Sequence, residues 1–318
     1  MVSVQRSNTS SAAYAFALVG GCAKQEAPLL TANELLQATR PTFPVIAMVT
    51  PSCWLGPRIR RIRQARMQPI ALQAVGAERV NCTGRFRGLP MHFQNTYAIF
   101  GMFGLTQYAA LLYLDTDLAI LSNLDHLLLG LLAAPSDEAQ IWTPQECKSF
   151  RPRQYNFNTG VWGIRPNLQT NRELMDFVAS GRHRCHIGFQ TAATSFFGTN
   201  RWEAQAQLLD VRYNLKPDHG FESCLWKRSV NLSQVQIVHW SGWRKPWGLR
   251  NPYPFEAESY RRYMLPFCFW DSTLNSSMVE HVKFCGVKGK RKDCGVKFCE
   301  TPAARAYARY GRLRGRFE

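Results

Sequence analysis

The sequence has no uninterrupted apolar stretch near the roughly 20 residues that a membrane-spanning helix needs. It also lacks the pairs of cysteines two residues apart that are typical of zinc fingers and ribbons, and ten cysteines in 318 residues are too few for a disulfide scaffold. No recognisable RNA- or DNA-binding motif is present. With 46% hydrophobic and 12% aromatic residues, the composition indicates a folded globule, with one large domain plus an appendage.

Acidic residues are scarce, with 22 Asp and Glu against 39 Lys and Arg, which gives a net charge of +17. Residues 283–318 hold eleven basic and three acidic residues, and the segment RIRRIRQAR at 58–66 holds five Arg and no acid. Such patches attract polyanions of any kind. A solvated basic face is the simpler explanation for both, so a nucleic-acid partner is disfavoured.

Other features of the sequence leave the compartment open. The run Ala12–Ala23 fits the apolar core of a signal peptide or a first strand and turn, and we favour the strand. In the tail, His281, Cys285, Cys294 and Cys299 are spaced unlike common zinc sites, which favours a disulfide or free thiols over zinc. Asn-x-Ser/Thr sequons at Asn8, Asn81, Asn231 and Asn275 permit a secretory route. The chain as it stands is expected in the cytoplasm, with the Golgi lumen as the alternative.

Short apolar runs of strand length alternate with segments of helical period, which predicts an α/β fold with a mainly parallel central sheet flanked by helices. The expected strands are Tyr14–Val19, Pro44–Val49, Ala109–Leu114 and Gln236–Trp240; the expected helices include Leu29–Arg40, an Arg-rich segment with Ile59 and Ile62 inward, and Thr96–Tyr108. Thr170 and Glu173 fit a capping box for a helix that ends at Gly181. The predicted organisation is an N-terminal tail at 1–11, one domain over 12–250 and a basic, cysteine-containing extension over 251–318.

Two carboxylates follow the apolar run Ala109–Leu114, in YLDTDLAI at residues 113–120. In an open α/β sheet, ligands bind at the carboxyl ends of the strands. In an extended chain Asp115 and Asp117 point to the same side, so both carboxylates can reach one cation. The alternative is a turn in which Asp117 bonds nearby amides.

His239 closes the last expected strand and is followed by Gly242 and Lys245. These residues offer a metal ligand, close backbone approach and a fixed positive charge, which together suit a metal-bound diphosphate. One imidazole with two carboxylates favours Mn²⁺ over Mg²⁺, which prefers oxygen ligands. Taken singly, His239 would be a core histidine and Lys245 a surface lysine, but together with the acidic pair they predict a metal and diphosphate site.

Three segments of the chain resemble glycosyltransferase family 8, the glycogenin-like retaining transferases that include plant glucuronosyltransferases. They are LTQYAALLYLDTDLAILSNLDHLL at 105–128, FNTGVWGIRPN at 157–167 and HWSGWRKPW at 239–247. The resemblance implies a GT-A fold with a UDP-sugar donor. It further implies that Asp115, Asp117 and His239 hold Mn²⁺ (or Mg²⁺), that Asp115, Gly242 and Lys245 meet the nucleotide diphosphate, that Asn158 and Gly160 line the sugar side, and that Gln190 is the catalytic residue.

Two positions depart from the family pattern. Ile99 stands where the family usually has Lys, and Phe189 stands where it has the Asp of an Asp-Gln pair. The leading hypothesis is a retaining transferase that moves a hexose or uronic acid from a UDP-sugar to a glycan, protein or small polyol acceptor. The alternative is a catalytically impaired member that acts as a nucleotide- or glycan-binding or regulatory module. A homodimer is left open.

Overall fold

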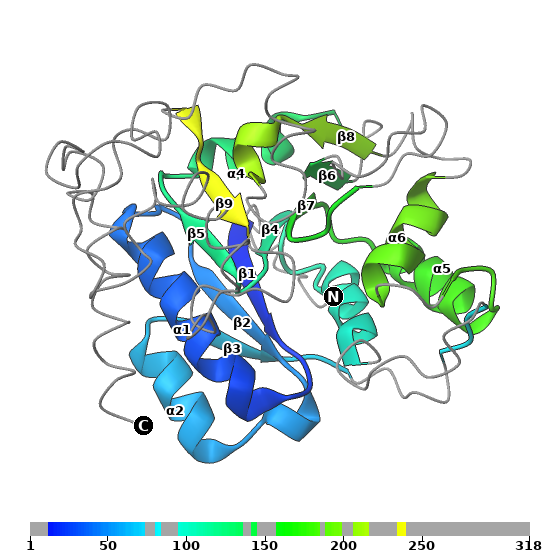
Figure 1. Cartoon of the computed structure of the whole chain (residues 1–318), viewed down its shortest axis with the longest axis horizontal. Helices are drawn as coiled ribbons and strands as arrows, with labels where there is room; N and C mark the ends of the chain where they lie inside the picture. Colours follow the sequence, from blue (N-terminus) through cyan, green and yellow to red (C-terminus); the bar gives the residue numbers. More distant parts are fainter. Residues whose placement is uncertain are drawn as a thin grey trace, which may run out of the picture.

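The computed structural model describes residues 12–73, 80–83, 95–135, 141–144, 157–184, 188–198, 206–215 and 234–239. The predicted tail at 1–11, the predicted extension at 251–318 and the histidine–cysteine cluster within it lie outside the described residues. Figure 1 shows the described elements gathered around one central sheet.

The central sheet has seven strands in the order β3-β2-β1-β4-β7-β6-β8. The strands are β1 (Ala12–Leu18), β2 (Val45–Val49), β3 (Gln68–Ala71), β4 (Ala110–Leu114), β6 (Ile141–Pro144), β7 (Val161–Ile164) and β8 (Ala206–Leu209). Strands β3, β2, β1 and β4 run parallel, β7 runs antiparallel to both of its neighbours, and β6 is parallel to β8. The predicted α/β fold with a mainly parallel sheet is therefore confirmed.

Helices cover both faces of the sheet. One face packs against α1 (Cys22–Ala38), α2 (Gly56–Gln64) and α4 (Asp125–Ala133), and the other against the 3₁₀ helix η3 (Thr96–Gly104), α5 (Leu168–Ala179) and α6 (Phe189–Gly198). Strand β1 shows why both faces are filled, because its large residues Tyr14 and Phe16 join the first core cluster while Ala13 and Ala15 join the second. Small residues on that second face leave room for the aromatic side chains of η3.

Three local predictions need correction. Helix α1 begins at Cys22, one turn after β1, and runs through Pro28, whereas the apolar spacing predicted a start at Leu29. The segment after residue 96 forms a 3₁₀ helix rather than an α-helix and ends at Gly104. Helix α5 is capped by Asn167, whose side chain accepts a hydrogen bond from the Thr170 amide at 2.9 Å, so the predicted capping box is wrong.

A second, two-stranded sheet pairs β5 (Leu118–Ile120) with β9 (Ile237–His239) in antiparallel register. Strand β9 lies within the predicted run Gln236–Trp240, but β5 was not predicted. The pairing places Leu118 opposite His239, and this register brings the acidic pair and the histidine to the same place.

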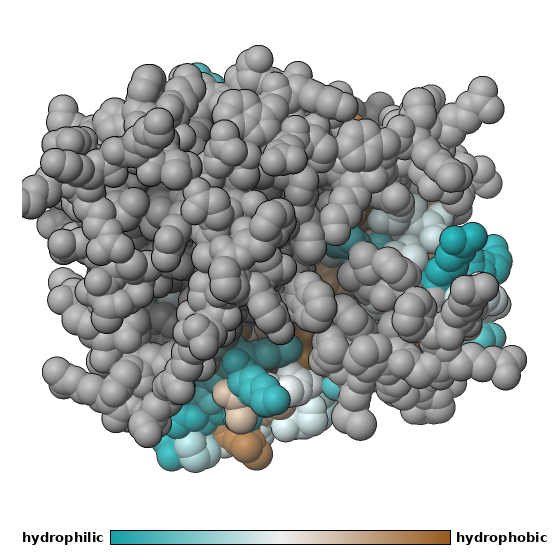
Figure 2. All heavy atoms as spheres, viewed as in Figure 1, coloured by the Kyte–Doolittle hydropathy of each residue, from teal (hydrophilic) through white to brown (hydrophobic). Residues whose placement is uncertain are grey.

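The described surface has few large apolar side chains. Those exposed are Trp54, Leu55, Leu129, Leu168 and Leu208. On the face in Figure 2, the lower edge is mostly hydrophilic with one small hydrophobic area. Within the described ranges, no helix combines the length and the apolarity needed to cross a membrane.

Candidate metal and nucleotide-sugar site

Asp115 and Asp117 lie in the turn between β4 and β5. Asp115 follows the last residue of β4, and its amide donates a hydrogen bond to the Gly160 carbonyl at 2.8 Å. Asp117 immediately precedes β5. The two residues are therefore not in extended chain, and the tight connection between the strands brings their carboxylates together instead.

His239, the last residue of β9, faces both carboxylates from the neighbouring strand. Its Nε2 lies 3.3 Å from Asp117 Oδ1 and 3.7 Å from Asp115 Oδ2. The imidazole is 1% exposed, whereas the side chains of Asp115 and Asp117 are 30% and 15% exposed. One ligand atom from each residue lies within 4.8 Å of the others. The predicted ligand set thus converges, with the histidine buried and the two carboxylates half-buried.

Asn214, which follows the 3₁₀ helix η4 (Val211–Tyr213), lies beside the His239 imidazole and determines which ring nitrogen faces the two aspartates. Its Oδ1 lies 2.7 Å from His239 Nδ1, and both side chains are buried. Because an amide oxygen only accepts, Nδ1 carries the proton and Nε2 presents its lone pair to the two aspartates. Sequence reasoning missed Asn214, since nothing local distinguishes it.

The donor set fits a divalent cation. His239 Nε2 is buried, lies 3.3 Å and 3.7 Å from carboxylate oxygens, and has no hydrogen-bond partner among the described residues, so a cation between the three groups would satisfy all of them. The Tyr113 hydroxyl donates to Asp115 Oδ1 at 2.6 Å, and burial, followed by the charge of Asp115, raises the pKa of Tyr113 well above its ordinary value. Tyr113 therefore stays a donor and orients Asp115 so that Oδ2 faces the histidine.

Gly160 lies against the His239 ring. A Cβ added to Gly160 would overlap the imidazole Cε1 and would lie 2.7 Å from Nδ1 and 2.9 Å from Asn158 Oδ1. The glycine therefore gives the imidazole its place beside β7. Gly160 was predicted to line the sugar side of the pocket, and the contact seen for it in the structure is with His239.

Asn158 and Gln190 form a hydrogen-bonded pair beside the same strand. Asn158 Nδ2 donates to Gln190 Oε1 at 3.0 Å, and the Thr159 amide donates to the same oxygen at 3.3 Å. Asn158 Oδ1 in turn accepts from the Gly160 amide at 3.0 Å. These bonds connect Gln190 through Asn158 to the glycine that supports His239.

The two departures from the family pattern are core residues. Ile99 is 2% exposed and Phe189 is 7% exposed, and both belong to the core cluster under η3, α5 and α6. The Phe189 ring packs edge-on against Tyr113, with centroids 6.4 Å apart, and also contacts Trp162 and Phe100. Both positions that depart from the family pattern therefore hold buried apolar side chains. Gly242 and Lys245 lie outside the described residues, so their roles remain predictions.

A mainly parallel sheet, with an acidic pair after its strand β4 and a histidine brought to that pair by the small β5–β9 sheet, defines a GT-A type α/β protein. The family model described as "Glycosyl transferase family 8" matches residues 81–250, and the chain belongs to this family. A search of the curated proteins found no match.

Solved structures with the same fold were also found. The apo form of the glycosyltransferase GlyE from Streptococcus pneumoniae TIGR4 aligns at 16% identity and a TM-score of 0.54, over 80% of this chain and 60% of GlyE. An active-site mutant of LgtC aligns at 16% identity and a TM-score of 0.53, over 78% of this chain and 93% of LgtC. A galactosyltransferase LgtC complex with donor and acceptor sugar analogs gives 15% identity and a TM-score of 0.51, over 76% of this chain and 90% of LgtC. The chain thus spans 60% of the length of GlyE, and these likenesses establish the GT-A type fold.

Proposed function

We propose that this protein is a retaining glycosyltransferase that moves a hexose or uronic acid from a UDP-sugar to an acceptor at a Mn²⁺-dependent site. The observation that carries the proposal is the convergence of Asp115, Asp117 and the Nε2 of His239 within 4.8 Å, with the tautomer of His239 fixed by Asn214. Membership of glycosyl transferase family 8 supports the same reaction class.

The residues present suit Mn²⁺ better than Mg²⁺, because an imidazole nitrogen takes one of the three ligand positions. A divalent cation bound there would neutralise the charge that develops on the diphosphate leaving group. Asp115, at 30% side-chain exposure, is the most accessible of the three residues and is the one that a diphosphate can approach, while His239 is held in the protein interior. Gly242 and Lys245 are proposed to contact the diphosphate from the segment after β9.

Gln190 is proposed as the catalytic residue that meets the transferred sugar. Its Oε1 accepts from Asn158 and from the Thr159 amide, so the side chain is held in one orientation and its amide group is the donor available to a ligand. Asn158 and Gly160 are proposed to form the sugar side of the pocket. A glycan, protein or small polyol is the proposed acceptor. The loops that surround the site would select among these acceptors.

The buried apolar side chains of Ile99 and Phe189 favour a second candidate, a family member that binds nucleotide-sugar or glycan without turnover. Both positions are buried in an aromatic cluster, so neither supplies the cation or carboxylate that the family has there. The metal site is common to both candidates, and only turnover distinguishes them.

The test is to incubate the protein with Mn²⁺ and a panel of UDP-sugars while following UDP release and, separately, binding of Mn²⁺ and UDP. We expect Asp117→Asn to weaken Mn²⁺ binding and to abolish turnover. Asp176→Asn, at an exposed position of α5, is the matched control and should leave both unchanged. Metal-dependent UDP binding without turnover would establish the second candidate, and Mn²⁺ binding unaffected in Asp117→Asn would contradict the proposed site.

A further inference from the structure

The cysteines of the described residues are all oxidised. Cys22 and Cys53 form a disulfide with their Cα atoms 5.4 Å apart, and Cys82 is also disulfide-bonded. Cys22 is the first residue of α1, and Cys53 is the last residue of the 3₁₀ helix η1 (Pro51–Cys53). The bond therefore ties together the segments that follow the adjacent parallel strands β1 and β2.

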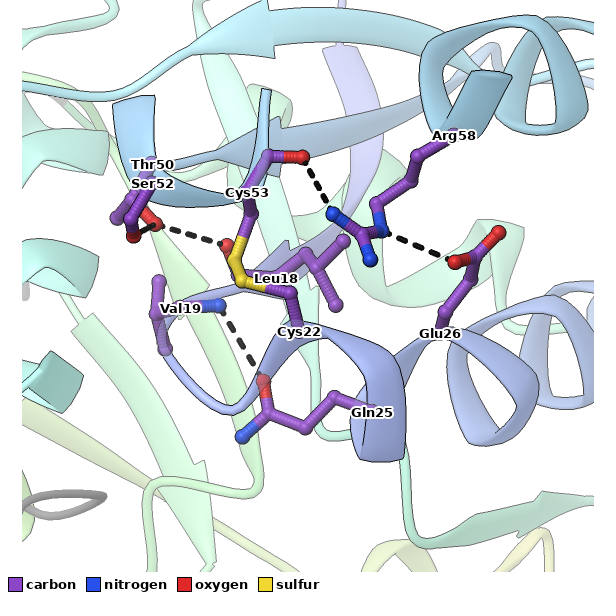
Figure 3. The surroundings of a disulfide bond; sticks show 9 residues. All are labelled: Leu18, Val19, Cys22, Gln25, Glu26, Thr50, Ser52, Cys53 and Arg58. Carbon is purple, nitrogen blue, oxygen red and sulfur yellow. Dashed lines mark hydrogen bonds and ion pairs between the residues drawn. A yellow bond between two sulfur atoms is a disulfide. The ribbon is translucent and has the colours of Figure 1, made fainter. Parts of the chain in front are cut away.

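Hydrogen bonds surround this disulfide, as Figure 3 shows, and Cys53 is buried while Cys22 is half-buried. Cys53 is fully buried, and its carbonyl accepts a hydrogen bond from Arg58 Nη1 at 3.0 Å. Arg58 in turn donates from Nε to Glu26 at 2.9 Å, and both of these side chains are 8% exposed. Burial of Cys53 limits exchange of the bond with small thiols on that side. Such structural disulfides form in oxidising compartments and are rare in the cytosol.

Asn81 belongs to the sequon Asn81-Cys82-Thr83 in a short segment beside the end of α5 (Figure 1). The side chains of Asn81 and Thr83 are both exposed. The segment is held by its backbone, since the Asn81 amide donates to the Val178 carbonyl at 3.1 Å and the Thr83 amide to the His183 carbonyl at 2.8 Å. A group on the Asn81 side chain would therefore project from the surface without disturbing these bonds.

Gly181 keeps the Asn81 amide uncrowded. A Cβ added at this position would lie 2.9 Å from Asn81 Nδ2, the atom that a glycan would modify. Gly181 also has a φ of +74°, which disfavours any larger residue there.

In the folded chain, Thr83 Oγ1 donates to the His183 carbonyl at 3.2 Å, so the hydroxyl that a sequon requires is engaged. Modification must then precede the docking of this segment on α5.

We propose that this chain matures in an oxidising, glycosylating compartment and carries an N-linked glycan on Asn81. The donor is an oligosaccharide joined to a lipid diphosphate. A bond forms between Asn81 Nδ2 and the anomeric carbon of the sugar, the bond from that carbon to the diphosphate oxygen breaks, and one Nδ2 proton is released with the lipid diphosphate. The inference rests on the disulfide, the sequon and its exposure, and it is independent of the proposed transferase activity.

The first experiment uses the full-length protein isolated from its own cells. Peptide N-glycosidase in heavy-oxygen water converts a glycosylated Asn into a labelled Asp, and mass spectrometry locates the label. A parallel digest, alkylated without reduction, reports the cysteines. We expect the label at Asn81 and a linked Cys22–Cys53 peptide. An unlabelled Asn81 would overturn the glycan, and separately alkylated Cys22 and Cys53 would overturn the oxidising compartment.

The second experiment directs the full chain into the secretory pathway of eukaryotic cells and compares variants. Asn81→Gln and Thr83→Ala should each lose one glycan by glycosidase-sensitive gel mobility. Thr83→Ser is the matched control, because it keeps the hydroxyl and should retain the glycan. If Asn81→Gln fails to fold, the two Thr83 variants still decide the outcome. Equal mobility of wild type and Thr83→Ala would overturn the assignment of this sequon.

Discussion

The hydrogen bond between His239 and Asn214 determines which imidazole nitrogen faces the two aspartates. Asn214→Leu keeps a side chain of similar size but removes the acceptor that lies 2.7 Å from Nδ1. A buried N–H left without an acceptor costs about 1–3 kcal/mol. The ring avoids this cost by changing tautomer, which places the proton on Nε2, 3.3 Å from Asp117 Oδ1. The proton then occupies the position that a metal ion requires.

In the Asn214→Leu variant, a metal ion can bind to Nε2 only if the imidazole first returns its proton to Nδ1. We expect the affinity for Mn²⁺ to fall about 10–100-fold, the usual effect of removing the hydrogen-bond partner of a metal-binding histidine. This corresponds to about 1.4–2.8 kcal/mol, which agrees with the cost of the unpaired N–H. Isothermal titration calorimetry measures the affinity, and thermal unfolding confirms that the variant is folded.

Asn214→Asp is the matched control, because it retains an acceptor oxygen for Nδ1. It should bind Mn²⁺ at least as tightly as wild type, since the added negative charge lies near the cation. If a folded Asn214→Leu variant binds Mn²⁺ with wild-type affinity, the tautomer argument is wrong. His239 would then not use Nε2 as a metal ligand.

Three further predictions follow from packing, burial and chain closure. Gly160→Ala places a methyl group 2.7 Å from His239 Nδ1, so chemical denaturation should show a loss of about 1–3 kcal/mol, and an unchanged stability would refute the contact. Burial lowers the pKa of His183 from 6.5 to about 4, so its neutral form stabilises the fold above pH 6.5 and this contribution is lost as the pH falls toward 4. This shift corresponds to about 3 kcal/mol, so over that interval the unfolding temperature of wild type should fall roughly 6–12 °C more than that of His183→Gln, and parallel curves would contradict this. Replacing both Cys22 and Cys53 by Ala opens a link across 31 residues and should cost about 3–4 kcal/mol in urea unfolding, with an unchanged midpoint as the opposing result.

Much of the sheet could be predicted from the sequence, because central parallel strands are buried on both faces and become continuous apolar runs. Strands β2, β4 and β9 fall within predicted runs, and β1 overlaps the predicted run Tyr14–Val19 but begins two residues earlier, at Ala12. Strand β5 was not predicted because it has only three residues and its backbone pairs with β9, which lies more than 100 residues later in the chain. The cap of α5 was misassigned because Asn167 and Thr170 both suit a helix start, and only the hydrogen bond to the Thr170 amide separates them.

The candidate metal site, like the sheet, could be predicted only in part. Asp115 and Asp117 could be predicted because they follow a strand of the α/β sheet, where ligands bind, and His239 because it closes an apolar run followed by glycine and lysine. Their actual convergence depends on the β5–β9 register, in which Leu118 stands opposite His239. The acidic pair lies in a turn rather than in an extended chain, and ligand atoms of the three predicted residues lie within 4.8 Å of one another.

The sequence by itself indicated the fold class and the three candidate metal ligands, because these depend on apolar periodicity and on residue types at strand ends, and three of its segments carried the resemblance to the family. Tertiary structure alone decided that Asn214 orients His239, that Gly160 gives the imidazole its place, and that Cys22 pairs with Cys53. It also decided that Ile99 and Phe189 lie in a buried aromatic cluster beside the site. Each of these contacts joins residues far apart in the chain, so its distance depends on strand register and helix packing rather than on local sequence.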